Sequence, residues 1–428
     1  MYDVLNAYLE NGLKVILHKI PGVKTMACGL WVRQGSVYET DEINGLSHLT
    51  EHLLLNPKDV TNNEYKGLME SVSSEGVIYN AATTKEYTCY YFTGMESALS
   101  TCLASLACIA KENRDFIEEY FINEKNVVIQ EATSFYSSYQ QIKERTSQAI
   151  WGNRGTGKII MGDIKNILDA SQQDVFQLIE KSYVPENATV IVIGNIDYQR
   201  TLFMIEEYFG RWRDEKGRIE EVPVENVPGV YINQGNGASA VISIGFRAPA
   251  YSSQDRSAVD MMVRMIGNSG MQSRLIQEIR IKRGLSYTLG GFSSLYKSRG
   301  TIGFMSVCDK TKATEVAKVM MDVLIDAKEK GFSEEEIQRE KNIMETAMLL
   351  AVDNITEHLR YIGKCSSMDR NFYIENEIRE IRNIEKDDIE RVTTQILQES
   401  NMGLAAIGEC DVDELLEVVS FTQREVRR

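Results

Sequence analysis

An internal repeat constrains the fold of this chain more than any other feature of its 428 residues. Several short segments recur in the same order, with a separation of 216 residues or close to it. The pairs are 29–30 with 245–246, 116–119 with 332–335, 124–126 with 340–342 and, at a separation of 214, 193–197 with 407–411. Ordered matches at nearly constant spacing indicate a duplicated domain rather than chance similarity between helices rich in glutamate and lysine.

Each copy is expected to mix strands with helices. Short apolar segments rich in β-branched residues predict strands, and longer segments with apolar residues on one helical face predict helices. The first copy has expected strands at 12–18, at 25–34 and within 183–197, and expected helices at 45–56, 97–111 and 117–135. We therefore predict an α+β fold made of two homologous α/β-sandwich domains.

A charged, irregular segment separates the two copies. It runs from Asp214 to Gly229 and holds Pro223 and Pro228, two of the six prolines. Proline and glycine within a polar stretch are typical of a linker. The predicted domains are therefore 1–213 and 231–428, with a linker at 214–230.

Charge and composition exclude several classes of protein. The chain has 47 basic and 62 acidic side chains, so its net charge of −15 argues against a nucleic-acid partner. No apolar run approaches the length that spans a membrane, and the N-terminus has no basic and apolar pattern of a secretory signal. The seven cysteines form an odd set without a CxxC motif, which favours reduced thiols and a cytoplasmic protein.

A histidine motif lies in the first copy only. His48 and His52 are four residues apart, so on a helix their rings share a face and can converge on one cation. Glu51 lies three residues after His48 and points the same way, where it can accept a proton from the attacking water. The arrangement is HxxEH, the inverse of the HExxH zinc motif. The alternative, two histidines on the surface of an amphipathic helix, is disfavoured because Leu53, Leu54 and Leu55 indicate a buried helix.

A catalytic zinc site needs a third protein ligand. The expected helix 117–135 offers Glu124 and Glu131, two turns apart on one face. The residues that follow His48, Glu51, His52 and Glu131 by 216 are Arg264, Gly267, Asn268 and Ala347, whereas Glu340 follows Glu124. Because the second copy lacks an equivalent of Glu131, we predict Glu131 as the third ligand. Glu124 is predicted to orient an imidazole ligand, although a solvated helix carboxylate is an equal alternative.

These residues resemble the pitrilysin/insulinase family of zinc metallopeptidases, in particular its two-domain branch with the mitochondrial processing peptidase subunits. The segments that carry the resemblance are GLSHLTEHLLL (45–55), NEKNVVIQE (123–131), YNAATTKEYTCYYF (79–92) and GMQSRLIQEIRIKRGLSYTL (270–289). The chain departs from the family at 56–59, after HxxEH, and it lacks the glycine-rich loop of the noncatalytic mitochondrial subunit. The resemblance implies one zinc per chain, held by His48, His52 and Glu131, with Glu51 as general base.

The resemblance also implies a substrate side. Asn80 and Ala81 would lie on a strand that binds an extended peptide by edge addition, which gives weak sequence preference. Arg280 and Tyr287 would stabilise the oxyanion from an opposing domain, although a structural role for both is the simpler alternative. In the two-domain branch one chain builds half of a closed chamber, so a homodimer or a heterodimer with a homologous subunit is expected.

The predicted function is therefore a cytoplasmic zinc endopeptidase that cleaves peptides or unfolded leader segments. Two alternatives remain. One is a noncatalytic scaffold subunit, which the intact motif disfavours. The other is a peptide-binding subunit with a structural metal, which would require a fourth protein ligand that neither the cysteines nor the other histidines offer.

Overall fold

The chain divides into two compact units. The computed structural model describes residues 3–56, 63–111, 116–213, 224, 227–235, 237–420 and 426–427. Unit 1 comprises Met1–Ser134, Ile160–Val222 and Leu350–Glu375, and unit 2 comprises Phe135–Ile159, Pro223–Leu349 and Asn376–Arg428. Most of the predicted linker, 214–223 and 225–226, lies outside the described residues.

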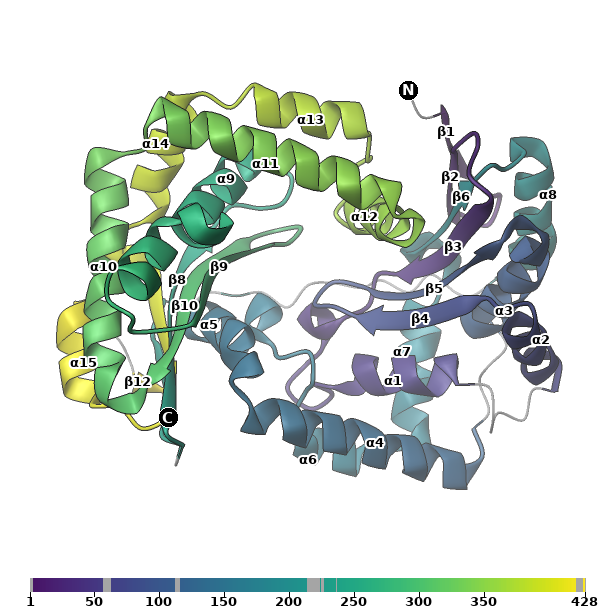
Figure 1. The fold of residues 1–428 in the computed structure, drawn as a ribbon. Helices are drawn as coiled ribbons and strands as arrows, with labels where there is room; N and C mark the ends of the chain where they lie inside the picture. The colour runs from purple at the N-terminus through teal and green to yellow at the C-terminus, as the bar shows by residue number, and fades with distance from the viewer. Residues whose placement is uncertain are drawn as a thin grey trace. The chain divides into compact units, whose positions relative to one another are not determined.

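Unit 1 is built on a six-stranded mixed sheet (Figure 1). The strand order is β1-β2-β6-β3-β5-β4, in which β2 and β6 are parallel and the other neighbours antiparallel. The bounds are β1 Asp3–Tyr8, β2 Lys14–Lys19, β3 Thr25–Val32, β4 Ile78–Thr83, β5 Thr88–Met95 and β6 Ala188–Gly194. Strand β4 forms one edge of the sheet and pairs with β5 alone.

Both faces of this sheet are covered by helices. Side chains alternate along a strand, so Met26, Cys28 and Leu30 of β3 join the main core on one face. Trp31 points to the other face, against Gly363 of α12, where a Cβ atom would come within 2.0 Å of the indole ring. The helices of unit 1 are α1 Leu46–Leu55, α2 Asn63–Ser74, α3 Leu99–Lys111, α4 Glu118–Ser137 (to Ser134), α6 Ile164–Asp169, α7 Gln172–Ser182, α8 Tyr198–Phe209 and α12 Ile355–Ser367.

Unit 2 repeats the plan. Its sheet order is β12-β7-β11-β8-β10-β9, with β7 and β11 parallel and β11, β8, β10 and β9 antiparallel in turn. The strands are β7 Val230–Asn233, β8 Ser239–Ala248, β9 Thr288–Leu295, β10 Gly300–Asp309, β11 Met402–Ile407 and β12 Val426–Arg427. The helices are α5 Ile142–Trp151, α9 Arg256–Gly267, α10 Ala313–Lys330, α11 Glu334–Asp353 (to Leu349), α13 Ile374–Arg382 (from Asn376), α14 Lys386–Ile396 and α15 Val412–Val419. Strands β2-β6-β3-β5-β4 of unit 1 therefore correspond in order to β7-β11-β8-β10-β9 of unit 2, as expected for a duplication.

The units differ from the contiguous domains 1–213 and 231–428 by two helical segments. Helix α5 comes from the first half of the sequence but packs on the sheet of unit 2, where Thr146 donates to Ser243 at 2.7 Å. Helix α12 comes from the second half but packs on β3 and β6 of unit 1. The two helices occupy equivalent places in the repeat, each following the long helix α4 or α11. Each sheet therefore depends on a helix from the opposite half of the chain, which a search for linker composition does not reveal.

Within the part of the chain that the structure describes, no helix combines the length and apolar character needed to cross a membrane.

Candidate metal centre

Helix α1 presents the histidine motif from a firmly packed position. Leu46, Leu49, Leu53 and Leu54 lie on one face of the helix and belong to the core of unit 1. This apolar spacing fixes the rotation of the helix, because only one orientation buries all four leucines. His48 and His52 lie on the opposite side, with ring centroids 4.8 Å apart and ring planes perpendicular.

Helix α4 supplies the third group. The Nε2 atoms of His48 and His52 lie 3.6 Å and 3.5 Å from the same oxygen, Oε2 of Glu131. One potential ligand atom from each of the three residues lies within 4.8 Å of the other two. Among the described residues, this is the one group of three or more His, Cys, Asp or Glu side chains that meets this distance criterion.

The spacing of these atoms fits zinc. Ligands at about 2.1 Å in a tetrahedral zinc site lie about 3.4 Å from one another, close to the distances found here. Separations of 3.5–3.6 Å are too long for good hydrogen bonds between imidazole nitrogen and carboxylate. Burial lowers the pKa of His48 to about 3, with a smaller contribution from the neighbouring His52. At neutral pH the ring of His48 is therefore uncharged, and its nitrogen can bind a metal.

Glu124 contacts one of the two imidazoles. Its Oε2 lies 3.3 Å from Nδ1 of His52, and its Oε1 accepts a hydrogen bond from Nδ2 of Asn56 at 3.2 Å. A proton on Nδ1 leaves Nε2 of His52 free to face Glu131. Burial lowers the pKa of His52, but the hydrogen bond to Glu124 and the charge of Glu131 outweigh it and leave the pKa above its ordinary value.

Glu51 lies on α1 beside the histidines but outside the group of three. Its Oε2 accepts a hydrogen bond from the hydroxyl of Thr83 at 2.5 Å. Burial raises the pKa of Glu51, while the hydrogen bond from Thr83 and the neighbouring His52 partly offset this effect. A buried carboxylate with a raised pKa is suited to accept and return a proton near neutral pH.

Comparison with known proteins gives the family. Residues 14–164 match the model of insulinase (peptidase family M16), and residues 169–344 match the peptidase M16 inactive domain. The chain belongs to peptidase family M16. An uncharacterized zinc protease of Rickettsia felis is 29% identical over 392 residues, which cover 91% of this chain and 93% of that protein.

Solved structures of other proteins share the fold. A protease from Helicobacter pylori has a TM-score of 0.88 at 17% identity and covers 96% of this chain and 100% of its own. A chain of complex III2 from Candida albicans has a TM-score of 0.84, also at 17% identity, and covers 97% of this chain and 100% of its own. This M16 protein therefore has the two-domain fold expected from the sequence.

The predicted substrate strand lies next to α1 in the M16 chain. Asn80 and Ala81 are on β4, which packs against α1 and forms the sheet edge (Figure 1). The backbone N–H of Ala81 donates to the side chain of Asn80 at 2.8 Å. Thr83, at the end of the same strand, links this edge to Glu51. Sequence reasoning missed Thr83 and Asn56, because threonine in a strand and asparagine after a helix are common without any role at a site.

Arg280 and Tyr287 lie in unit 2 and contact each other. The guanidinium carbon of Arg280 lies 4.3 Å from the centre of the Tyr287 ring, and Tyr287 is 79% exposed. Arg280 belongs to a π-helical segment, Ile276–Ile281, a geometry that is rare and frequent at functional sites.

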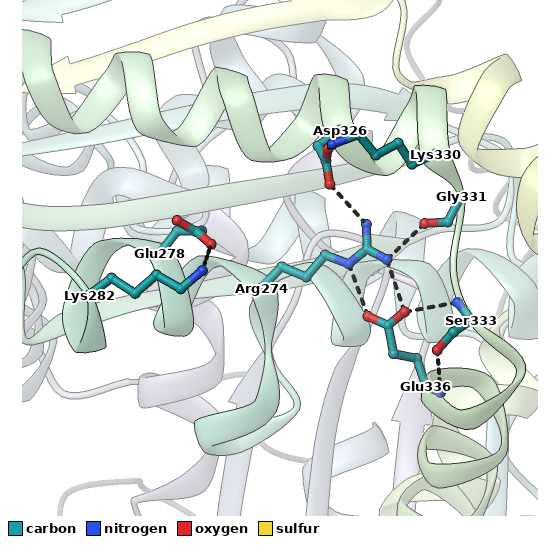
Figure 2. Close-up of polar contacts among 8 residues, drawn as sticks. All are labelled: Arg274, Glu278, Lys282, Asp326, Lys330, Gly331, Ser333 and Glu336. Carbon is teal, nitrogen blue, oxygen red and sulfur yellow. Dashed lines mark hydrogen bonds and ion pairs between the residues drawn. The ribbon is translucent and has the colours of Figure 1, made fainter.

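Ion pairs anchor the start of this segment (Figure 2). Arg274 donates to both carboxylate oxygens of Glu336 at 3.0 Å and to the carbonyl of Gly331 at 2.8 Å. Glu278 accepts from Lys282 at 2.5 Å, and Lys330 pairs with Asp326. Arg274, Glu278, Asp326, Lys330 and Glu336 line part of a hollow of about 610 Å³. Because these charges already neutralise one another, the hollow is better explained as a solvated surface than as a ligand site.

Unit 2 shows what replaces the centre in the second copy. Helix α1 is followed by Asn56, whose N–H donates to the carbonyl of His52, and α9 is followed by Asn268, whose N–H donates to the carbonyl of Arg264. Arg264 is therefore the counterpart of His52, so the correspondence predicted from a separation of 216 is wrong within this helix. The shift arises because the connection before α9 is shorter than the connection before α1.

The acidic partner is retained. Nε of Arg264 donates to Glu340 at 2.5 Å, just as His52 contacts Glu124 in unit 1. A guanidinium thus supplies the positive charge beside the glutamate of unit 2. With this alignment Asp260, Arg264 and Ala347 correspond to His48, His52 and Glu131, so the three candidate ligands are not repeated in the second copy.

Proposed function

We propose that this M16 protein is a zinc-dependent endopeptidase that cleaves peptides or unfolded leader segments. The observation that carries the proposal is the convergence of two Nε2 atoms on one carboxylate oxygen of Glu131, with Glu51 beside them. The relatives named zinc proteases support the metal and the reaction class. Three protein ligands would leave the fourth position of a tetrahedral zinc ion for water, as in catalytic rather than structural zinc sites.

Each residue has a defined task in this proposal. His48, His52 and Glu131 would hold zinc, which when bound supplies the Lewis acidity that polarises a scissile carbonyl and acidifies water. Glu51 accepts the proton of the attacking water and returns it to the leaving amine. Thr83 holds the carboxylate of Glu51 through its hydroxyl, and Glu124 fixes the ring of His52. Burial raises the pKa of Glu51, which makes its carboxylate a stronger base for the proton of water.

The free edge of β4 is the proposed substrate site. An extended peptide that pairs with this edge would be recognised mainly through its backbone, so cleavage would depend on length and conformation more than on sequence. The strand connects directly to the base, because Thr83 follows Asn80 and Ala81 on β4. A docking peptide must first displace the hydrogen bond between Asn80 and Ala81.

Arg280 and Tyr287 are proposed to stabilise the oxyanion. The exposure of Tyr287 and the cation–π contact with Arg280 support a pair that is held together and open to a ligand. We propose that a second chain, identical or homologous, completes a closed chamber in which each pair serves the zinc of its partner. All seven cysteines lie among the described residues and none is in a disulfide, which supports our proposal of a cytoplasmic location.

The test combines metal analysis with cleavage mapping. Wild type should contain about one zinc per chain and cut a peptide library at sites that mass spectrometry can locate. Glu51→Gln keeps the size of the side chain but cannot accept a proton, so turnover should fall at least ~100-fold while zinc is retained. Glu180→Gln, on α7, serves as a matched control and should cleave normally.

Two results would contradict the proposal. Near-wild-type turnover of zinc-loaded Glu51→Gln would refute the role of the base. A zinc-loaded wild type that binds peptides without cleaving any would favour the alternative function, a noncatalytic scaffold or peptide-binding subunit of a heterodimer. The fold shared with a chain of complex III2 is compatible with either function, because fold alone does not determine catalysis.

A further inference from the structure

The N-terminus of α1 is held by a buried carboxylate that lies earlier in the chain. Glu39 has no exposed surface. Its Oε1 accepts from the N–H of Ser47 at 2.7 Å, and its Oε2 accepts from the N–H of Gly45 and from the side-chain amide of Asn44, both at 2.9 Å. The first N–H groups of a helix have no partner within the helix, and a negative charge at this end is favourable. Glu39 therefore acts as a cap from six to eight residues away.

The local packing explains why the cap comes from outside the helix. The N-cap residue is Gly45, which has φ +105°, a conformation that residues with a side chain rarely adopt. A Cβ atom at Gly45 would lie 3.0 Å from the Cα of Gly162 and 3.1 Å from Ile167. Serine or aspartate, the usual N-cap residues, would not fit there. The close approach of Gly162 thus requires glycine, and glycine leaves the helix without a capping side chain of its own.

This end of the helix carries one of the proposed metal ligands. His48 is the third residue of α1 and follows Ser47 directly, so it belongs to the first turn. His52 lies one turn further on and has an anchor of its own in Glu124. Loosening of the first turn would therefore displace the ring of His48 more than the ring of His52.

We propose that Glu39 is a positioning residue for the metal centre, acting through the first turn of α1 on His48. This inference rests on the proposed function, since it assumes that His48 binds zinc. Glu39 itself does not touch the metal or the substrate. Its effect is to hold the backbone so that Nε2 of His48 stays within reach of the ion that His52 and Glu131 also bind.

The test is a graded series at Glu39 with zinc affinity as the readout. Glu39→Gln removes the charge and places an amide donor against N–H groups, and Glu39→Asp keeps the charge but shortens the reach. Loss of groups that orient metal ligands typically costs 10–100-fold in metal affinity. We expect Glu39→Gln to lower zinc affinity by about 10–100-fold and Glu39→Asp to lie between it and wild type. Competition with a chelator measures the affinity, and the absorption spectrum of the cobalt-loaded protein reports the geometry of the ligands without any activity measurement.

A matched control separates positioning from general destabilisation. Asp197 caps α8 in the same unit by accepting from the N–H of Arg200 at 2.8 Å, and it is not part of the metal centre. Asp197→Ala should lower the thermal midpoint, as the loss of a helix cap does, yet leave zinc affinity and the cobalt spectrum unchanged. Circular dichroism verifies that each variant is folded, and Glu39→Asp carries the test if Glu39→Gln does not fold.

The outcomes distinguish this inference from the proposed function. If wild type binds zinc and cleaves peptides but the Glu39 variants bind zinc within twofold of wild type, only the inference is overturned. The same holds if Asp197→Ala weakens zinc binding as much as Glu39→Gln does. If wild type binds no zinc, the proposed function fails and the inference fails with it.

Discussion

Acid should destabilise unit 1 through a buried pair of histidines that is separate from the metal centre. His18 on β2 and His358 on α12 have ring centroids 5.5 Å apart, on the sheet face that α12 covers. Burial lowers the pKa of His18 from 6.5 to about 3, with a smaller contribution from the neighbouring His358. Burial likewise lowers the pKa of His358 to about 4, although a hydrogen bond with the backbone of Val352 raises it in part.

The sign and size of the effect follow from these pKa values. The unfolded chain takes up a proton on His18 below pH 6.5, whereas the folded chain resists it until about pH 3. The stability due to neutral His18 is therefore fully present above pH 6.5 and is lost as the pH falls through this window. At pH 5, one and a half pH units into the window, the loss is about 2 kcal/mol. For a unit of this size, that lowers the thermal midpoint by about 4–8 °C.

Calorimetry of His18→Leu and wild type measures the stability that protonation of His18 removes. Leucine cannot be protonated, so the variant should lose less stability between pH 7.5 and pH 5, and the difference in midpoint should shift by about 4–8 °C in its favour. Any packing cost of leucine is independent of pH and cancels. Ile16→Leu is the matched control, because Ile16 lies two residues away on the same face of β2 and its pH curve should run parallel to wild type. A chelator in every sample removes any bound metal, so that His48 and His52 contribute equally to the pH dependence of wild type and of each variant. Parallel curves for wild type and His18→Leu would refute the reasoning.

Three further predictions concern the metal centre, the units and the partner chain. Glu124→Gln should lower zinc affinity by about 10–100-fold through His52, measured by chelator competition; an unchanged affinity would make Glu124 a solvated helix residue. A fragment of residues 1–230 should lack fixed tertiary structure in near-ultraviolet circular dichroism, because it has lost α12, whereas fusing 350–375 to it should restore the signal; a well-folded fragment without α12 would contradict the division into units. Mixing Glu51→Gln chains with Arg280→Ala/Tyr287→Phe chains should recover about a quarter of wild-type activity if each pair serves the partner's zinc in a two-fold dimer. With subunit exchange shown by differently tagged chains, no recovery would place the pair's role within its own chain or remove it.

The repeat predicted the architecture because each copy of a duplicated sequence forms a sheet with the same topology. The equal core strand orders of the two units express that duplication. The spacing of His48, Glu51 and His52 also places the three side chains near one another, since helical geometry alone determines which residues share a face. Glu131 could be selected because the second copy has alanine at the equivalent position, a comparison within one sequence.

Tertiary structure decided what local spacing cannot express. The exchange of α5 and α12 depends on which sheet face each helix covers, and both helices follow equivalent long helices in the sequence. The counterpart of His52 is Arg264 rather than Asn268, because a loop shortened by a few residues shifts the helix register while the strands keep theirs. The contacts of Thr83 and Glu39 were likewise hidden, because a hydrogen bond between residues 32 positions apart, or one that a glutamate accepts from the start of a helix, leaves no periodic pattern. The sequence by itself therefore determined the repeat and the grouping of His48, Glu51 and His52 on one helix, where covalent geometry sets the distances. Only the packed structure determined which distant groups contact those side chains, because such contacts arise when separate elements are buried against one another.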